Sequence, residues 1–499
     1  MNMMELHPNL DPAKLALELS GKHLIDGVFC AAASGRNFDV VNPATGKKIG
    51  EAADGNVEDV DRAVKAAVTA QRAWGKVNAR DRGKILSDAA RKLSDHAEEL
   101  ALLVALESGK ALRTESRPEG NATADVFNFF AGLASELKGE TVPLKSTALT
   151  YTVREPVGVV AAIIPWNAPM LLMAFKIAPA LVAGNAVVVK SAEETPLAVL
   201  RVIQILNAFL PPGLLSIVSG DGPGCGGPLV AHPAVRKVTF TGSVETGKII
   251  YRAAAEKIIN VTLELGGKSA MIVMADADLE QAVEGAVSGM RFTRQGQSCT
   301  AASRMLVHAS LHDVFVEKLK ARVNALKMGD PLDEKTDIGT VISRPQYAKI
   351  LSYIASGKAE KGAVAHICAA MPTDSKLAEG LFIQPVIFTG VPTTSRLIRE
   401  EIFGPVTCVI PFSDVEEAIR IANDSDFGLA ATVWTKDLKI ALNAANTLEA
   451  GLVQINQNQV AGPNISYGGV KLSGVGKELS LESMLEHFTH KKTVIVNLE

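Results

Sequence analysis

The sequence has no long hydrophobic run. Although 47% of its residues are apolar, no unbroken apolar stretch reaches the roughly 18 residues that a membrane-spanning helix needs. The richest stretch is interrupted by Pro165 and Asn167. The N-terminus, which reads M-N-M-M-E-L-H-P, also lacks the basic and apolar regions of a secretory signal peptide. We therefore predict a cytoplasmic protein with no membrane partner.

The sequence also has little net charge and few aromatic residues. The formal net charge is −3, aromatic residues make up 5% of the chain, and lysine and arginine do not gather in one segment as nucleic-acid binding would require. No C-x-x-C spacing links the five cysteines, which stand at positions 30, 225, 299, 368 and 408. This scatter predicts neither a zinc site nor a disulfide framework. We expect a small-molecule partner, no nucleic acid and no metal.

The length of the chain and its alternation of apolar and amphipathic segments predict the fold class. A chain of 499 residues can fill two large cores. After a short β-rich lead, residues 57–112 carry apolar positions at three- and four-residue intervals, which predicts helices. From Tyr151 onwards, Val- and Ile-rich runs alternate with amphipathic stretches, beginning with 157–164, 186–190 and 214–220. This alternation predicts a parallel sheet with crossover helices.

A second set of strand candidates follows Gly266, at residues 269–273, 304–308, 382–388 and 406–412. It predicts a second α/β domain. The chain ends in the strand candidate 491–498, which has no partner nearby in sequence. Together with residues 149–153, this strand is a candidate for pairing with another subunit.

Two strand ends carry small or hydroxyl residues that suit a phosphate. Glycines at positions 220–227 follow the run L-L-S-I-V, and Gly242 and Ser243 follow V-R-K-V-T-F at the start of a predicted helix. Backbone N–H groups at such a helix start can bind a diphosphate. A tight turn and an ordinary serine cap are equally good readings, because the spacing G-x-G-x-x-G is missing. Lys190 and Glu193 lie at the end of another strand. They either bind the ribose of a ligand or are exposed to solvent where the strand ends.

Two further residues suggest chemistry. Cys299 lies in R-Q-G-Q-S-C-T, among polar neighbours, so a nucleophile and an inert thiol are equally consistent with its surroundings. Glu264 interrupts the apolar run V-T-L-E-L, where burial would raise its pKa and suit it to general-base work. The alternative for Glu264 is an ion pair with Lys268. No nearby histidine supports a cysteine hydrolase, which stays open as a second class.

Taken together, these segments resemble the aldehyde dehydrogenase superfamily, from about Gly27 to the C-terminal strand. The motifs are P-W-N at 165–167, L-E-L-G-G-K-S around Glu264, G-Q-S-C ending at Cys299 and E-E-I-F-G-P-V at 400–406. Two more similar segments begin at Asn423 and Ser466. In them Phe427 and Tyr467 stand where tyrosine and phenylalanine are usual, and Ser466 stands where proline is usual.

The resemblance implies an α/β fold with three parts. A Rossmann-like NAD-binding domain would comprise residues 1–138 and 160–265, and a second α/β domain, residues 266–473, would supply Cys299. A small β oligomerisation element would comprise 139–159 and 474–499. The implied assembly is a homodimer or a homotetramer.

The resemblance also implies a covalent mechanism. Cys299 would attack an aldehyde to give a thiohemiacetal, held by the side-chain amide of Asn167 and the backbone N–H of Cys299. Glu264 would activate the water that hydrolyses the resulting thioester, and Lys176 would assist proton movement. Because members that acylate coenzyme A lack this glutamate, its presence implies a free acid as product.

For the cofactor, Glu193 would bind the adenosine ribose and repel a 2′-phosphate, which favours NAD over NADP. NADP stays an alternative, since Lys190 is near and Ser191 stands where proline is common. The residues that the resemblance places at the cofactor are Ile164, Pro165, Trp166, Lys190, Glu193, Gly222, Gly226, Phe240, Gly242, Ser243, Leu265, Glu401 and Phe403.

The resemblance places these residues around the substrate: Ala168, Leu172, Phe175, Thr293, Ser298, Thr300, Ala461 and Tyr467. Ala168, Thr293 and Ala461 are small where bulky aromatics are common, so we predict a bulky or aromatic aldehyde. Arg291 and Arg294 keep a semialdehyde open as an alternative. A cofactor-independent cysteine esterase and a nucleotide-binding scaffold are the alternatives from other classes.

Overall fold

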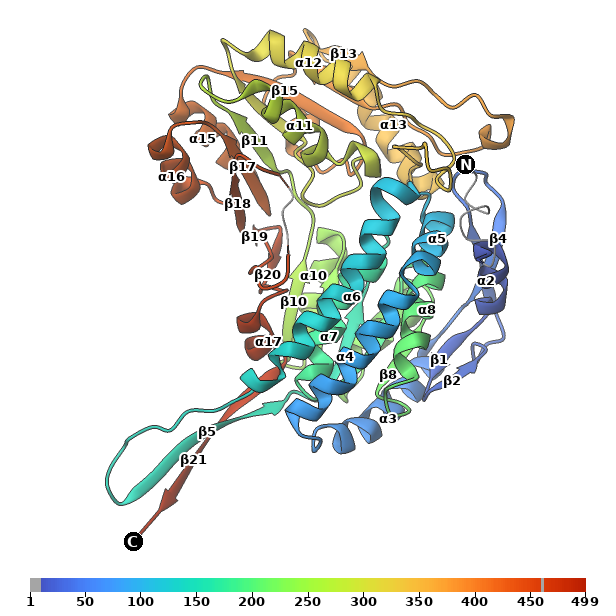
Figure 1. Ribbon diagram of the computed structural model, residues 1–499, viewed down its shortest axis with the longest axis vertical. Helices are drawn as coiled ribbons and strands as arrows, with labels where there is room; N and C mark the ends of the chain where they lie inside the picture. The colour runs from blue at the N-terminus through green and yellow to red at the C-terminus, as the bar shows by residue number, and fades with distance from the viewer. Residues whose placement is uncertain (1–9, 459–461) are drawn as a thin grey trace.

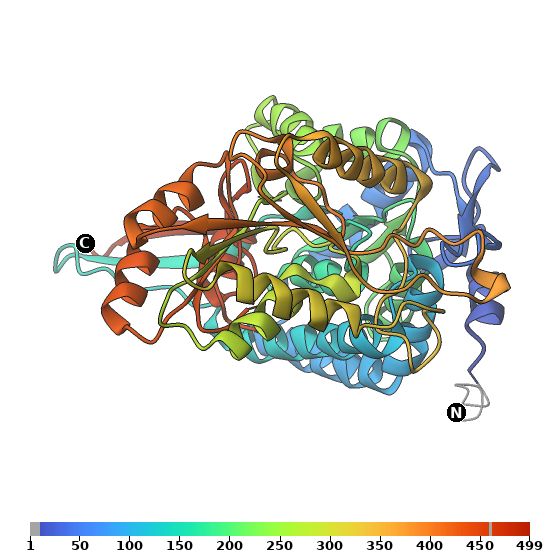
Figure 2. The same ribbon diagram turned by 90° about the horizontal axis from the view of Figure 1, so that it is seen from above.

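A computed structural model describes residues 10–458 and 462–499. Two large sheets, each flanked by helices, form the body of the molecule, and a two-stranded ribbon projects from it with the C-terminus (Figures 1 and 2). The predicted α/β class is confirmed. Within the described residues, no helix is long and apolar enough to cross a bilayer.

The first sheet has eight strands in the order β2-β1-β8-β7-β6-β9-β10-β20. Its members are β1 (His23–Ile25), β2 (Val28–Cys30), β6 (Val159–Ile163), β7 (Ala186–Lys190), β8 (Leu215–Val218), β9 (Val235–Thr241), β10 (Asn260–Glu264) and β20 (Gly474–Val475). The inner five strands are parallel. In chain order they run outward from β6 on one side and from β9 on the other, so the strand order reverses between β6 and β9. Ligands of open α/β sheets bind at such a reversal, beyond the carboxyl ends of the strands.

Helices cover both faces of this sheet because its parallel strands are apolar on both sides. Every residue of β6 and β7 is buried. The helices of this half are α2 (Pro12–Leu19), α3 (Val57–Trp74), α4 (Ala79–Asp95), α5 (Ala97–Ser108), α6 (Arg117–Gly132), α7 (Pro169–Val182), α8 (Pro196–Asn207), α9 (Gly227–Ala231), α10 (Val244–Ala255) and α17 (Leu481–His487). The helical stretch predicted over 57–112 is therefore realised as α3, α4 and α5. A small hairpin of β3 (Asn37–Val41) and β4 (Lys48–Ala53) lies beside them.

The second sheet has seven strands in the order β13-β14-β15-β12-β11-β17-β18. They are β11 (Ala270–Val273), β12 (Arg304–His308), β13 (Val364–Ile367), β14 (Val386–Thr389), β15 (Val406–Phe412), β17 (Ala430–Trp434) and β18 (Leu452–Ile455). Its helices are α11 (Leu279–Met290), α12 (His312–Asn324), α13 (Arg344–Ala359), α14 (Arg396–Arg399), α15 (Val415–Asn423) and α16 (Leu438–Thr447). A short pair, β16 (Phe427–Gly428) with β19 (Val470–Lys471), lies outside this sheet.

One predicted strand is shorter than expected. The sequence run 382–388 enters the sheet only as β14, from Val386. Pro385 lies directly before it, and proline has no N–H to donate to a neighbouring strand. The prediction of a strand over the whole run was therefore wrong for its first half.

The ribbon consists of β5 (Ala148–Pro156) and β21 (Thr489–Asn497), which pair antiparallel from Thr489 opposite Pro156 to Asn497 opposite Ala148. The C-terminal strand thus pairs within its own chain. The division into two domains and an oligomerisation element stays a proposal. Two elements of the segment 474–499 belong with the first sheet instead: β20 pairs with β10 at its edge, and Met484 of α17 packs in its core.

Candidate active site

Two cavities meet at Cys299 and Asn167, which line both of them. The first, which we call the sheet-edge cavity, has a volume of about 190 Å³ and lies beyond β6 and β9, where the strand order reverses. It is lined by Pro165, Trp166, Asn167, Thr241, Gly242, Ser243, Leu265, Gly266, Cys299, Gln346, Lys349, Glu401 and Phe403. Seven of the residues predicted to bind the cofactor are therefore brought to one place: Pro165, Trp166, Gly242, Ser243, Leu265, Glu401 and Phe403.

An aromatic pair and a carboxylate shape the sheet-edge cavity. The rings of Trp166 and Phe403 meet edge to face with centroids 5.2 Å apart. Phe403 has the left-handed backbone conformation (φ 57°), which a bulky residue rarely adopts outside functional sites. Glu401 accepts a hydrogen bond from the N–H of Gly267 at 2.8 Å, while burial raises the pKa of its carboxyl. A Cβ on Gly266 would clash with the Glu401 carboxylate, so any larger residue at 266 would force that side chain to move.

The remaining predicted cofactor residues lie along the same sheet, outside the described lining of this cavity. Lys190, at the end of β7, pairs with Glu193 at 3.0 Å. Gly222 and Gly226 form a single turn after β8, and this turn is capped by Asp221. Ile164 and Phe240 are buried, Ile164 directly after β6 and Phe240 within β9. Ser243 is the cap of α10, accepting from the N–H of Thr246 at 3.2 Å, so the plain capping reading holds for its side chain.

The second cavity, which we call the inner cavity, has a volume of about 110 Å³. It is lined by Asn167, Ala168, Leu171, Leu172, Phe175, Ser269, Ala270, Arg291, Arg294, Ser298, Cys299, Thr300, Ala302, Ala430, Ala431, Thr432, Leu452, Gln454, Asn458 and Tyr467. Six predicted substrate residues are among them. Thr293 is not among the described lining residues, and its hydroxyl donates to Glu115 at 2.5 Å. Ala461 lies outside the described residues.

A tightly bonded loop presents Cys299 between the two cavities. The loop follows α11, and Gln295 and Gly296 both have positive φ. The side chain of Gln297 donates to the carbonyl of Thr340 at 3.3 Å and accepts from the N–H of Ile342 at 3.0 Å. These bonds tie the loop to the segment before α13. The positive φ values and the bonds of the Gln297 side chain therefore fix the backbone that presents Cys299.

The thiol of Cys299 has one close polar partner among the described residues. Its Sγ lies 3.5 Å from the hydroxyl oxygen of Tyr467. Burial raises the pKa of Cys299 to about 11, whereas the hydrogen bond from Tyr467 lowers it. Asn167 lines the same two cavities as Cys299, and its Nδ2 donates to the carbonyl oxygen of Gln297 at 3.4 Å. A thiol and a side-chain amide on the same cavity suit a covalent attack on a carbonyl.

Glu264 stands at the carboxyl end of β10 and is 3% exposed. Neither of its oxygens has a hydrogen-bond partner within the described part of the chain. Burial raises the pKa of its carboxyl well above the usual value, as the sequence predicts, and Glu478 raises it further. The alternative of an ion pair with Lys268 is not realised: Lys268 Nζ is also unpaired among the described residues, and burial lowers its pKa to about 8. Glu264 lies against Gly468 and does not line either cavity.

Lys176, on α7, is completely buried and pairs with Glu478 at 2.7 Å. The same carboxylate accepts a hydrogen bond from the hydroxyl of Thr239 at 2.9 Å. The ammonium group of Lys176 therefore points to Glu478, and Lys176 is not among the described residues that line the inner cavity. Its charge still acts on the site, since it lowers the pKa of Glu264.

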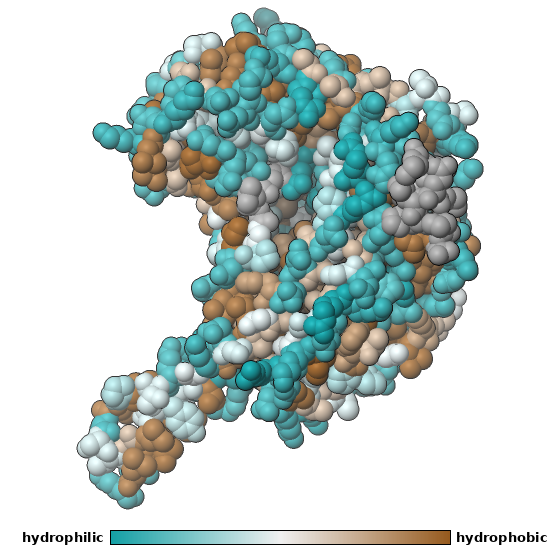
Figure 3. Space-filling view, viewed as in Figure 1, coloured by the Kyte–Doolittle hydropathy of each residue, from teal (hydrophilic) through white to brown (hydrophobic). Residues whose placement is uncertain are grey.

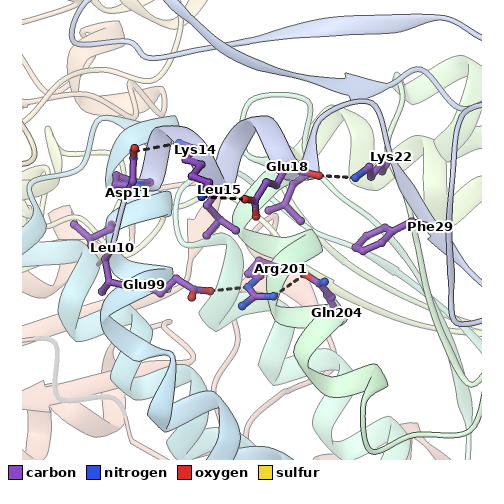
Figure 4. Close-up of a pocket in the computed structure, with 13 residues that line it drawn as sticks. Leu10, Asp11, Lys14, Leu15, Glu18, Lys22, Phe29, Glu99, Arg201 and Gln204 are labelled. Atoms are coloured by element: carbon purple, nitrogen blue, oxygen red, sulfur yellow. Dashed lines mark hydrogen bonds and ion pairs between the residues drawn. The ribbon is translucent and has the colours of Figure 1, made fainter. Parts of the chain in front are cut away.

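A larger cavity, of about 430 Å³, lies away from these residues, between α2 and the helices α5 and α8 (Figure 4). Its wall carries the ion pair of Glu99 with Arg201 at 2.6 Å, and Arg201 also donates to Gln204. The residues described along it include no cysteine. Size alone does not make an active site, so we place the chemistry where the two smaller cavities meet.

Four residues at the sheet-edge cavity escaped prediction from the sequence: Thr241, Gly266, Gln346 and Lys349. Gln346 and Lys349 lie on α13, which belongs to the second sheet's half of the molecule. Gln346 also donates to the carbonyls of Ile402 and Phe403. No local motif marks α13, because its residues reach the site only through tertiary packing.

Comparison with known proteins identifies the family. The sequence profile of the aldehyde dehydrogenase family matches residues 29–494. The chain is 41% identical over 497 residues to a phenylacetaldehyde dehydrogenase of Pseudomonas fluorescens, covering 97% of each chain. It is also 41% identical to a hydroxyisobutyraldehyde dehydrogenase of Mycolicibacterium austroafricanum, covering 95% of this chain and 93% of that one.

A solved structure gives the same result for the fold. The betaine aldehyde dehydrogenase of Staphylococcus aureus in complex with NAD⁺ superposes with a TM-score of 0.93 at 38% identity, covering 98% of this chain and 97% of that one. The asparagine, glutamate and cysteine motifs recognised in the sequence stand together at the junction of the two cavities or directly beside it. This chain belongs to the aldehyde dehydrogenase family.

Proposed function

We propose that this aldehyde dehydrogenase oxidises a bulky or aromatic aldehyde to the free carboxylic acid with NAD. The observation that carries the proposal is the position of Cys299, which lines both cavities and so can meet a substrate on one side and a cofactor on the other. Two relatives support the substrate class, since their names specify phenylacetaldehyde and hydroxyisobutyraldehyde. The many alanines along the inner cavity leave room for a ring or a branch.

The residues of the sheet-edge cavity fit a nicotinamide dinucleotide. Trp166 and Phe403 offer aromatic surface, Glu401 offers a carboxylate for ribose hydroxyls, and α10 begins beside Gly242 with N–H groups that favour a phosphate. Bound NAD supplies the hydride acceptor. Glu193, on the same edge, favours an unphosphorylated ribose because a 2′-phosphate would be repelled.

The chain's own side chains carry the covalent steps. Cys299 Sγ, once deprotonated, bonds to the aldehyde carbon, and the carbonyl oxygen becomes an oxyanion that the amide of Asn167 can stabilise. After hydride loss the acyl group remains on Sγ as a thioester. Glu264, whose raised pKa suits a general base, takes a proton from water as that water displaces the thiolate. Its side chain must turn away from Gly468 toward Cys299 for this step.

The test is NADH formation with a panel of aldehydes, using NAD and NADP in parallel. We expect Cys299→Ala to abolish NADH formation, and Cys30→Ala, at a cysteine on β2 that lines neither cavity, to leave it intact. Glu264→Gln should give one NADH per active site in a burst and then stall, because acylation proceeds while hydrolysis does not. Ester cleavage without any need for a cofactor would instead support a hydrolase. Clearly higher kcat/KM for short unbranched aldehydes than for phenylacetaldehyde would refute the bulky substrate.

A further inference from the structure

The wall of the inner cavity carries more positive than negative charge. Arg291 and Arg294 both line it, and one carboxylate, that of Glu115, lies against both. Arg294 bonds closely to that carboxylate, through Nη2 at 2.6 Å and Nε at 2.8 Å. Arg291 is 3.9 Å from it and is thus only loosely paired. Two positive charges face one negative charge, which leaves the charge of Arg291 largely uncompensated.

The neighbouring groups do not remove this excess. Lys110 and Glu119, the next charged pair, neutralise each other. Among the described residues, Arg291 Nε has no hydrogen-bond partner. The Arg291 side chain is 30% exposed, and although burial lowers its pKa to about 10 it remains charged at neutral pH. A guanidinium withdrawn from water without a full partner is unfavourable, and an anion entering the cavity would complete its bonding.

The backbone holds Arg291 in this position. It ends α11 in the left-handed conformation, with φ 55° and ψ 45°, where glycine is the usual residue. Its carbonyl accepts hydrogen bonds from the N–H groups of Arg294 at 2.9 Å and Gly296 at 2.8 Å. The same turn continues directly into the loop that carries Cys299. The turn therefore fixes the backbone from which both Arg291 and Cys299 reach the inner cavity.

From this arrangement we propose that Arg291 binds a carboxylate at the far end of the substrate, so that the enzyme takes aldehydes bearing a carboxylate group. This inference rests on the proposed function, because it refines the substrate of the same site. The guanidinium would bind the carboxylate through two parallel N–H···O bonds, while the aldehyde lies at Cys299. Since both groups line one cavity of about 110 Å³, the linker between carboxylate and aldehyde is short. An aromatic ring that bears both the carboxylate and the aldehyde provides such a short linker. It also belongs to the bulky aldehydes of the proposed function.

The experiment compares 4-carboxybenzaldehyde with its neutral methyl ester. For the natural chain we expect kcat/KM to favour the carboxylate by about tenfold to a hundredfold, through KM, as a charge-assisted bond predicts. Arg291→Met should bring the ratio close to one, and Arg291→Lys should give an intermediate ratio, because it keeps the charge but loses the planar fork. Arg322→Met, which removes an exposed arginine on α12, should leave the ratio unchanged.

A second measurement needs no variant. 4-Methylbenzoate should inhibit the natural enzyme competitively against the aldehyde, and 4-methylbenzamide, its neutral analogue, should inhibit much more weakly. Equal inhibition by the two, or a carboxylate-to-ester ratio that Arg291→Met leaves unaltered, would overturn the carboxylate site while NADH formation still supports the dehydrogenase. Absence of NADH with every aldehyde would overturn the proposed function itself.

Discussion

At the scale of single residues, Tyr467 sets this chain apart from the family pattern, in which phenylalanine is usual. Its hydroxyl lies 3.5 Å from Cys299 Sγ, where a phenylalanine would have no donor. A hydrogen bond to a thiolate stabilises the charged form and lowers the pKa of the thiol. Burial acts in the opposite direction and leaves the pKa of Cys299 at about 11. Tyr467 therefore makes the nucleophile easier to ionise than burial alone would allow.

We predict that Tyr467→Phe slows alkylation of Cys299 by iodoacetamide about threefold to tenfold at fixed pH, from the loss of about one hydrogen bond. The sign follows from the thiolate being the reactive form: a higher pKa means a smaller thiolate fraction at every pH below it. Mass spectrometry of Cys299 between about pH 7 and pH 10 should show the whole rate profile moved to higher pH. Tyr251→Phe, at a half-exposed position on α10, serves as the control. A profile that stays in place or moves to lower pH contradicts the prediction.

The sequence predicted some features of the site residues, but not the contacts between residues that lie far apart in the chain. The position of Glu264 inside an apolar run was enough to predict the raised pKa of its carboxyl. The motifs were enough to gather Trp166, Glu401 and Phe403 at one cavity. The contact of Tyr467 with Cys299 and the place of Glu115 under Arg291 were not predictable in this way. These contacts join residues far apart in the chain, and no local pattern encodes them.

At the scale of elements, α7 shows how the site is held. Its first N–H groups, those of Met170 and Leu171, donate to Glu119 at 2.9 and 3.4 Å. At its other end, Arg82 donates to the carbonyl of Val182 at 2.8 Å and Trp74 donates to another terminal carbonyl. A carboxylate at the start and a guanidinium at the end both match the helix dipole. The helix that bears the wall of the inner cavity is thereby fixed at both ends.

We predict that Glu119→Gln lowers the free energy of unfolding by about 3–5 kcal/mol, the cost of leaving a buried ion without its partner. Glu119 pairs with Lys110, and both side chains are at most 3% exposed. Lys110 also donates to the carbonyl of Asn167 at 3.3 Å, so kcat should fall as well. Urea unfolding measures the stability change. Asp88→Asn, in an exposed pair on α4, is the control and should cost at most about 1 kcal/mol.

A double variant separates the pair from general damage to the helix. Adding Lys110→Met to Glu119→Gln removes the stranded charge and should restore part of the lost stability. If Lys110→Met instead lowers the free energy of unfolding of the Glu119→Gln variant as much as it lowers that of the natural chain, the ion pair does not explain the lower stability of Glu119→Gln.

The sequence predicted the strands of the first sheet but not their order. The strands of the first sheet were readable because they are buried on both faces and hence continuously apolar. The apolar runs did not predict the order of these strands in the sheet, because that order depends on tertiary packing. The observed order places the cavity beyond β6 and β9. The apolar run before β14 predicted a longer strand, but Pro385 has no N–H to donate to a neighbouring strand, and only Val386–Thr389 enters the sheet.

At the scale of the whole molecule, the ribbon of β5 and β21 is a structure without a core of its own. It projects from the body, and apolar side chains gather toward its end (Figures 1 and 3). Leu144 and Ile495 are each 61% exposed, as is Leu498. A two-stranded hairpin is marginally stable in water unless its apolar face is covered. A second copy of this chain is the partner that we propose for it, giving the homodimer or homotetramer expected from the sequence.

We predict that Ile495→Glu reduces the mass of the particle in solution, measured by size exclusion with light scattering. The isoleucine lies exposed on β21, and burying a carboxylate in its place against a second subunit would cost several kcal/mol. Leu17→Glu, at a residue 66% exposed on α2, adds the same charge on the body and should leave the mass unchanged. Because the ribbon projects from the body and Ile495 lines neither cavity at Cys299, the Ile495 variant should still be alkylated at Cys299 at the natural rate (Figure 1). A natural chain that is already monomeric, or a variant of undiminished mass, would show that the apolar end of the ribbon has another purpose.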